Sequence, residues 1–301
     1  MTNITLKKDS KYYKFKNILG KVLVYLGLSI YAIWILAPFI IVLITSFTPD
    51  IDIQSEFKFI GFDKWVFTGY ENALIDYVID LESGGEQSAL LVGLGNTLLY
   101  VLPPTILGLF ASAIAAFAFS KMRFKGSGLL FGLLLMTMLI PGSITTVPSY
   151  LVYAKLDLQT TPIPLIIPGM FGAAACVFFL KQFFTGIPTE LVEAAKLDGL
   201  GYFSIFWRIF VPLSVPALLA QGLLGFIAGY NDYFGPYLYL MASDAEYQTL
   251  QVILRTFTSQ FASKNGTAMA GCILAMVPTI VIYLFCQKYF VEGIATSGMK
   301  L

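Results

Sequence analysis

The chain has 301 residues, of which 57% are hydrophobic and 12% are charged, and its net charge is +1. Soluble domains carry about 25% charged residues, so this composition excludes a soluble globular protein and indicates a membrane protein with several spans. The chain has no histidine, and its three cysteines lie in apolar stretches without metal-site spacing, so we expect neither metal nor histidine-based catalysis. The nearly neutral charge gives no indication of nucleic-acid binding.

The N-terminal part predicts a membrane anchor followed by an external loop. Residues 1–21 are polar and lysine-rich, and residues 22–47 form an uncharged run of 26 residues, more than the roughly 20 that cross a bilayer. We interpret this run as the first span and not as a cleaved signal peptide. Residues 48–88 hold nine acidic residues but only Lys58 and Lys64. The aromatic residues of this loop favour a small packed core or an interfacial anchor over a sugar platform. They are Trp65, Phe67 and Tyr70.

Five more apolar segments predict five more spans, which gives an all-α integral membrane protein with six transmembrane helices. A basic triplet, Lys121, Arg123 and Lys125, follows the second span and marks the cytoplasmic side. Prolines interrupt several of these segments. Such breaks are tolerated where the helix lines a cavity or packs against a neighbouring helix. The predicted spans are residues 89–119 (interrupted by Pro103 and Pro104), 126–150, 162–180, 209–241 and 267–287.

A polar, helix-forming island lies between the fourth and fifth spans. Pro188 can begin a helix because its missing N–H would be unpaired there, and Glu190 and Glu193 place negative charge at the positive end of the helix dipole. Gly199 is expected to end the helix. Ala194 and Ala195 keep one side of it small enough for another protein to approach closely. The island therefore predicts a docking element outside the bilayer.

The distribution of charge predicts the orientation of the six spans. The segments placed in the cytoplasm hold 14 of the 19 Lys/Arg residues and 5 of the 18 acidic residues, and the external segments hold the other 5 basic and 12 acidic residues; Asp232 lies within the fifth span. Because basic residues favour the cytoplasmic side, both termini and the polar island are predicted to be cytoplasmic.

The polar island carries a resemblance to a known family. Its sequence Glu193-Ala194-Ala195, then Asp198-Gly199 and the downstream Pro212, resembles the "EAA" loop of ABC importer permeases. In that family this loop forms the coupling helix, which sits in a groove of a cytoplasmic ATPase. The alternative is an amphipathic helix that packs only on its own chain, but the extended pattern between two spans favours coupling. The resemblance implies a type I ABC importer permease fold with cytoplasmic N and C termini and an ATPase-coupling loop at residues 186–208.

Two further segments resemble the carbohydrate branch of this family, like the second membrane subunit of maltose-type importers. Residues 229–236 resemble its Trp-Asn-Asp motif, with Tyr230 where tryptophan is usual, followed by Asn231 and Asp232. The tail resembles the closing Gly-x-x-x-Gly-x-x-Lys segment, in which Gly298 and Lys300 would contact the ATPase. The sequence departs from the pattern at Tyr230, at Leu200, where a small residue is common, and at Leu301, which extends the tail.

Asn231 and Asp232 admit two interpretations. An ionisable residue inside a membrane usually faces protein or water, so Asp232 can lie on the translocation path. It can also belong to a buried hydrogen-bonded pair that holds a break in the fifth span, and this structural role is the one that we expect.

The resemblance implies a permease subunit that moves a sugar or oligosaccharide across the cytoplasmic membrane. The partners would be a homologous second permease, two copies of a cytoplasmic ABC ATPase, an external solute-binding protein, the sugar and membrane lipid. ATP and Mg²⁺ would be bound by the ATPase, because this chain has no Gly-x-x-x-x-Gly-Lys-Ser/Thr phosphate loop; the chain itself would carry no cofactor and would not be an enzyme. We divide the chain into residues 1–88, with the basic tail, first span and acidic loop, and residues 89–301, the permease core.

Other functions fit the sequence less well. An ABC importer of a peptide, polyamine or phosphorylated compound is the main alternative. A secondary carrier would show ionisable residues at several membrane depths, and an intramembrane enzyme would need a nucleophile or metal constellation.

Overall fold

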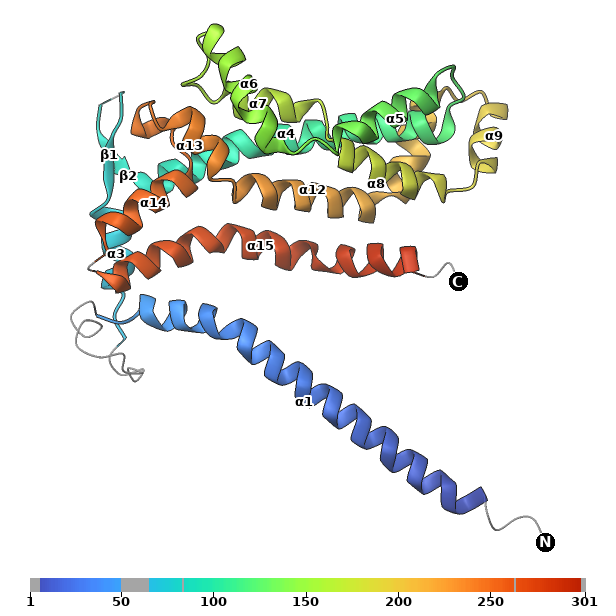
Figure 1. Cartoon of the computed structure of the whole chain (residues 1–301), viewed down its shortest axis with the longest axis horizontal. Helices are drawn as coiled ribbons and strands as arrows, with labels where there is room; N and C mark the ends of the chain where they lie inside the picture. Colours follow the sequence, from blue (N-terminus) through green and yellow to red (C-terminus); the bar gives the residue numbers. More distant parts are fainter. Residues whose placement is uncertain (1–5, 50–64, 83, 263, 299–301) are drawn as a thin grey trace.

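The computed structural model describes residues 6–49, 65–82, 84–262 and 264–298. Most of this part is helical, and most of the long helices run along the long axis of the molecule (Figure 1). One end, the hairpin end, holds α3 (Thr68–Ile75), β1 (Val78–Asp80), β2 (Glu86–Ser88) and α14 (Leu250–Gln260). The opposite end, the α9 end, holds α9 (Glu190–Leu197). The N-terminal part of α1 (Leu6–Ser46) and the C-terminal part of α15 (Asn265–Gly298) point toward the α9 end.

Four helical segments are long and apolar enough to cross a membrane, and two bent helix pairs raise the number to as many as six. This agrees with the six predicted spans, although the structure breaks more of them than the sequence suggested. The four segments are Phe15–Ser46, Ala89–Lys121, Ile163–Thr185 and Asn265–Gln287.

The first helix, α1, diverges from the other helices over most of its length (Figure 1). None of the residues in the apolar window of its span is buried. It joins the rest of the chain at the hairpin end, where the Ser46 and Tyr70 hydroxyls are 2.7 Å apart. The ring of Phe47 stacks on Trp65 with 4.8 Å between centroids and also contacts Phe67 and Tyr70. The aromatic residues of this loop thus pack around Phe47 while Phe67 stays 66% exposed, an arrangement that fits both a small packed core and an interfacial anchor.

The second span, α4 (Ala89–Lys121), is one continuous helix. The expectation that Pro103 and Pro104 interrupt it is wrong, because both lie inside the helix. Gly169 packs directly against Pro104, and such contacts with neighbouring helices allow proline to remain within a membrane helix.

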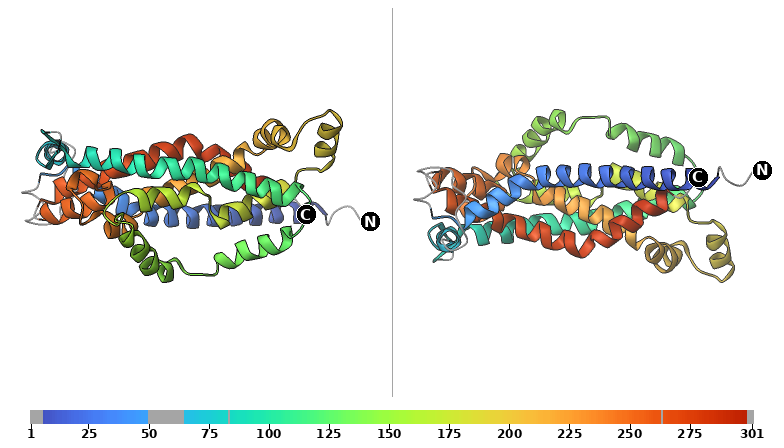
Figure 2. Two further views of the ribbon diagram at one scale, coloured as in Figure 1. Left: turned by 90° about the horizontal axis from the view of Figure 1, so that it is seen from above. Right: turned by 90° about the horizontal axis from the view of Figure 1, so that it is seen from below.

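The third span is bent by 92° between α5 (Ser127–Thr137) and α6 (Gly142–Lys155). The predicted span over 126–150 is therefore present as two helices. Pro141 has extended backbone angles just before α6, and proline also disfavours a helical conformation of the residue that precedes it. In both views of Figure 2 these two helices bow away from the other long helices.

The fourth span consists of α7 (Ile163–Met170) and α8 (Ala174–Thr185). Gly172 separates them with a φ of +92°, and the Ser112 hydroxyl of α4 accepts a hydrogen bond of 3.1 Å from the Ala173 N–H. α4 and α7 approach so closely that a Cβ atom on Gly108 would lie 2.2 Å from the Gly169 carbonyl oxygen.

The fifth predicted span, 209–241, is not one helix. An 81° bend near Ser214 separates residues 202–213 from α12 (Val215–Tyr230), and a second break precedes α13 (Phe234–Leu240). Pro212 and Pro216 flank the first bend and remove two helical donors there. The segment before the bend comprises α10 (Tyr202–Ile205), the π-helical turn η2 (Phe206–Phe210) and α11 (Val211–Leu213). Between α13 and α15 lie the turn η3 (Ala245–Tyr247) and α14, an amphipathic helix that was not among the predicted elements.

Candidate functional site

Helix α9 presents two different faces. Val192 and Ala195 face the protein and are only 3% and 5% exposed. Glu190, Glu193, Ala194 and Leu197 are exposed, and Leu197 is 90% exposed. Positions i, i+3, i+4 and i+7 lie on one side of a helix, so these four residues form one outward surface, the α9 outer face.

The structure corrects the prediction for one of the two alanines. Ala194 lies on the α9 outer face as expected, but Ala195 is buried against the chain itself. Its small size allows α9 to pack closely on the bundle and does not shape the docking side. Leu197 was not among the predicted site residues, although a helical wheel places it beside Glu190 and Glu193.

The C-terminus of α9 has the geometry that the glycine predicted. Gly199 has a φ of +80°, its N–H donates to the Lys196 carbonyl at 3.0 Å, and the Leu200 N–H donates to the Ala195 carbonyl at 3.0 Å. This pair of bonds is the Schellman arrangement, which satisfies the last carbonyl groups of a helix. Asp198 is the C-cap residue before this turn and is exposed.

α9 is mounted on a hydrophobic cluster at the α9 end of the bundle. The buried side chains of Val192 and Ala195 join residues from α4, α8, α10, η2 and α12. Close-packed interiors transmit displacement because they compress little, so a shift of α9 would move these helices with it. The largest aromatic members of the cluster are Phe117, Phe184, Phe206 and Phe210.

Lys121 also holds the segment that leads into α9. Its ammonium group donates to the Ile187 carbonyl at 2.5 Å and lies 3.5 Å from the hydroxyl of Thr189, the N-cap residue of α9. Glu190, the first residue of α9, attracts the same ammonium group. The last residue of α4 is thereby tied to the beginning of α9. Pro212 follows α9 and α10 in the chain, is exposed, and lies next to the 81° bend that precedes α12.

The second predicted site, residues 230–232, lies at the break after α12. Tyr230 is 1% exposed, and its hydroxyl donates to the Ala275 carbonyl of α15 at 2.8 Å. The Asn231 amide donates to the Ile227 carbonyl at 2.9 Å. Asp232 Oδ1 accepts the Gly235 N–H at 3.3 Å at the beginning of α13. Asn231 and Asp232 therefore bond to backbone groups on the two sides of the break, and Tyr230 fixes the end of α12 to α15.

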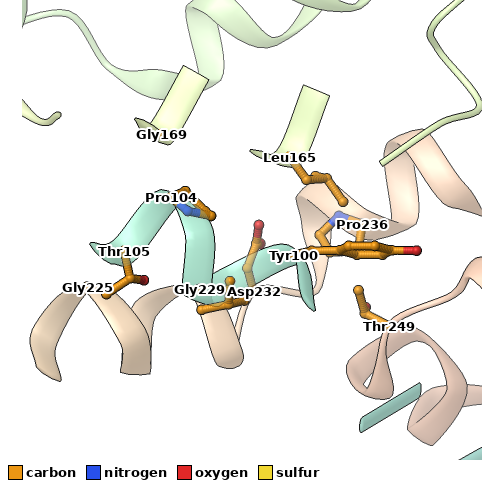
Figure 3. Close-up of a pocket in the computed structure, with 11 residues that line it drawn as sticks. Tyr100, Pro104, Thr105, Leu165, Gly169, Gly225, Gly229, Asp232, Pro236 and Thr249 are labelled. Carbon is orange, nitrogen blue, oxygen red and sulfur yellow. The ribbon is translucent and has the colours of Figure 1, made fainter. Parts of the chain in front are cut away.

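The expectation of a buried Asn231–Asp232 pair is nevertheless wrong. Both side chains are exposed, and their hydrogen bonds go to backbone groups and not to one another. Asp232 lines a cavity of about 270 Å³, and its carboxylate points into the space between α4 and α7 (Figure 3). The remaining wall residues come from α4, α7, α12, α13 and the residue that precedes α14: Tyr100, Val101, Pro104, Thr105, Leu165, Gly169, Gly225, Gly229, Pro236 and Thr249.

The wall of this cavity toward the hairpin end is held by hydrogen bonds from α4. The Tyr100 hydroxyl donates to the Tyr247 carbonyl at 3.2 Å, and the Asn96 amide donates to the Glu246 carbonyl at 2.6 Å. Hydrogen bonding and charge from Glu246, with a further contribution from Glu82, raise the pKa of Tyr247 to about 12.

Among the residues that the structure describes, no group of three His, Cys, Asp or Glu side chains could hold a metal ion. Gly298 is the last residue of α15, and Lys300 lies outside the described residues.

Broken apolar helices that line a cavity, with an exposed polar helix at one end, are the features of a multi-span membrane transport subunit. Residues 105–296 match the family described as binding-protein-dependent transport system inner membrane component. The chain belongs to this family and is therefore a multi-pass protein of the cytoplasmic membrane.

Known relatives and a solved structure support this assignment. The chain is 31% identical over 206 residues (68% of this chain, 73% of the relative) to the arabinooligosaccharides transport system permease protein AraQ of Halalkalibacterium halodurans. It is 34% identical over 204 residues (67% and 72%) to the sn-glycerol-3-phosphate transport system permease protein UgpE of Yersinia pestis. The fold is similar to a chain of a bacterial ABC transporter involved in the import of the acidic polysaccharide alginate, with a TM-score of 0.74, 25% identity, and coverage of 91% of this chain and 97% of that chain.

Proposed function

We propose that this chain is one membrane subunit of an ATP-driven importer for a sugar or oligosaccharide. A homologous permease subunit completes the pore, and an extracytoplasmic binding protein delivers the sugar. The α9 outer face docks on a cytoplasmic ATPase, of which two copies bind and hydrolyse ATP with Mg²⁺, and the chain itself is not an enzyme. The observation that carries this proposal is the exposed α9 outer face on a helix whose other side is packed into a hydrophobic cluster.

The geometry supports a mechanical role for α9. Its outer face offers two carboxylates and an exposed leucine to a partner, while its inner face is packed into the cluster from which α4, α8 and α12 extend. Closure of the ATPase would displace α9. The hydrophobic cluster would pass that displacement to α4 and α12, which also line the cavity. Glu190, Glu193, Ala194 and Leu197 contact the ATPase in this proposal, whereas Ala195, Asp198, Gly199 and Pro212 position the helix; Gly298 and Lys300 in the tail add contacts to the ATPase.

The direction of the chain in the membrane is part of the proposal. The α9 end and both termini face the cytoplasm, and the hairpin end faces outward. The excess of basic residues in the segments of the α9 end supports this orientation.

A phosphorylated solute is the second candidate, because one of the relatives is an sn-glycerol-3-phosphate permease. The carboxylate of Asp232 in the cavity favours a neutral sugar over an anion, since like charges repel in a confined site.

The test is ATP-dependent uptake by proteoliposomes that contain this chain, its second permease, the ATPase and the binding protein. We expect uptake of arabino-oligosaccharides and not of sn-glycerol-3-phosphate. Glu193→Lys should cancel the negative charge of the α9 outer face and abolish sugar-stimulated ATP hydrolysis while the chain still inserts into the membrane, and Glu193→Gln should retain more of the stimulation. Stimulation of the Glu193→Lys complex to the level of the wild type would show that α9 does not couple through this face.

A further inference from the structure

Residues 202–213 lie across the direction of the membrane helices. This stretch, the transverse segment, comprises α10, η2 and α11 and meets α12 at an angle of 81°. In both views of Figure 2 it lies to one side of the long helices. Since α12 runs along the long axis of the molecule with the other spans (Figure 1), the transverse segment is nearly parallel to the plane of the membrane.

The transverse segment has a buried face and an exposed aromatic face. Ile205, Phe206 and Phe210 are at most 2% exposed and belong to the hydrophobic cluster beneath α9. Phe203 and Trp207 are 69% and 53% exposed. They are four residues apart and therefore share one side of the segment. Two large exposed rings on one side of a helix parallel to the membrane are typical of an interfacial helix.

Contacts with α4 give the depth of the transverse segment in the membrane. The ring centroid of Phe206 lies 6.1 Å from that of Phe110 and 5.5 Å from that of Phe117, and Phe210 lies 4.8 Å from Phe117. Phe110 and Phe117 precede Lys121, the last residue of α4, by 11 and 4 residues, which corresponds to about 16 and 6 Å along the helix. The transverse segment therefore lies within the leaflet that faces the α9 end.

Arg208 directly follows Trp207 and is also exposed. Its guanidinium group has no hydrogen bond or ion pair with any residue that the structure describes. A cation near the hydrocarbon region is unfavourable unless it reaches the interface or pairs with an anion. Arginine reaches the headgroups by extending its aliphatic stem, its planar guanidinium binds phosphate through two hydrogen bonds, and tryptophan is enriched at the same level of the membrane.

We propose that Phe203, Trp207 and Arg208 form a binding site for an anionic phospholipid of the cytoplasmic leaflet. The two rings contact the glycerol and the upper part of an acyl chain, and Arg208 donates hydrogen bonds to the phosphate. The excess of basic residues in the segments of the α9 end favours an anionic lipid over a zwitterionic one.

The lipid site has a consequence for α9. The buried faces of α9 and of the transverse segment belong to one hydrophobic cluster, so a lipid held by the transverse segment steadies the base on which α9 moves. This inference rests on the proposed function, which sets the orientation of the chain and gives α9 its coupling role.

The test is native mass spectrometry of the purified complex of this chain, its second permease and the ATPase, incubated with equal amounts of phosphatidylglycerol and phosphatidylcholine. The wild type should retain phosphatidylglycerol preferentially. Arg208→Gln should weaken the binding of one phosphatidylglycerol about tenfold, the effect of losing a charge-assisted hydrogen bond, and Arg208→Lys should keep most of it. Excess inorganic phosphate should not displace the lipid, because it lacks the acyl chain that contacts Phe203 and Trp207.

Two matched variants serve as controls. Arg123→Gln makes the same change at an exposed arginine just after α4. Trp34→Ala removes a 74% exposed tryptophan of α1 that has no basic residue beside it. Trp207→Ala should weaken the binding of phosphatidylglycerol severalfold, whereas neither control should change it.

Three outcomes would overturn the lipid site. Equal losses in Arg208→Gln and Arg123→Gln would reduce the effect to general attraction between lipid and positive charge. Equal retention of the two lipids by the wild type would show that the headgroup is not recognised. Loss of the ATPase instead of lipid from the Arg208→Gln complex would show that this face contacts protein. Sugar uptake by the wild-type proteoliposomes would in each case still support the proposed function, so the two ideas fail separately.

Discussion

Gly199 is the residue at which backbone geometry alone sets the path of the chain after α9. Its φ is +80°, and a Cβ atom placed there would meet nothing within 4 Å. A side chain at this position therefore meets no steric obstacle from neighbours, and any effect of substitution comes from the backbone. The left-handed conformation costs a residue with a Cβ atom roughly 1–2 kcal/mol, and a β-branched residue is particularly unfavourable there.

We expect Gly199→Val to loosen the turn after α9 and to reduce both ATPase co-purification and uptake. Gly201→Val is the matched control, because Gly201 also has no atom within 4 Å of a built Cβ but has a φ of −74° and extended geometry that valine adopts readily. Equal uptake and equal ATPase recovery in the two variants would contradict the prediction.

At the same scale, the sequence predicted Gly199 correctly because a glycine after a helix has a single common use. It could not distinguish Ala194 from Ala195, because neighbouring residues on a helix point 100° apart and only the packing shows which one faces the bundle. It also could not assign Asp232, which supports α13 through a backbone hydrogen bond and at the same time lines the cavity.

Among the elements, α4 and the beginning of α9 are joined by Lys121 in addition to the hydrophobic cluster that they share. Lys121→Ala removes the hydrogen bond to the Ile187 carbonyl. Hydrogen bonds to charged groups contribute about 1.5–3 kcal/mol to stability. Because Lys121 is half-buried, we expect its contribution to lie at the lower end of this range. We expect faster amide hydrogen exchange in residues 186–199 and weaker sugar-stimulated ATP hydrolysis, with recovery in Lys121→Arg. Arg123→Ala, which removes an exposed charge from the same segment, should leave both unchanged; exchange that rises equally in Arg123→Ala would argue against a specific role for Lys121.

The contact between α4 and α7 depends on two glycines. In Gly108→Ala the new methyl group would lie 2.2 Å from the Gly169 carbonyl oxygen, and overpacking of this kind typically costs about 1–3 kcal/mol. In Gly95→Ala, on the same helix, the methyl group meets nothing within 4 Å, and the higher helix propensity of alanine should maintain or slightly increase stability. Thermal unfolding in detergent should therefore show a lower Tm for Gly108→Ala only. A lower Tm for both would indicate that the tight contact is not the cause.

The positions of the elements were easier to predict than their continuity. Long uncharged runs located α1, α4 and α15, because the thickness of the bilayer sets a minimum length. Prolines did not reveal which helices break: α4 continues through Pro103 and Pro104, whereas the third span bends by 92° before α6. The outcome depends on whether a neighbouring helix supports the proline, and a single sequence does not contain that information. α14 was missed because it is short and its exposed side is polar.

For the whole molecule, the proposed orientation makes a topological prediction. Green fluorescent protein fused after Leu301 should fluoresce, because it folds in the cytoplasm, and alkaline phosphatase inserted after Asp244 in the loop before η3 should be active, because it requires the external side. An active phosphatase at the C-terminus or an inactive one after Asp244 would reverse the orientation of the chain and remove the basis for ATPase docking at α9.

The attachment of α1 has a consequence for biosynthesis. The helix meets its own chain where α3 fits between Ser46 and Gly266, with a Cβ on Gly69 only 3.1 Å from the Gly266 oxygen. More than 200 residues separate these two contact points in the sequence. At about 5–20 residues per second, a ribosome needs roughly 10–40 s to make the interval. During this time α1 can pair with the loop that follows it, through Tyr70 and Trp65, but lacks its contact with α15, so we expect a pause in translation to prolong the period in which membrane proteases can recognise α1.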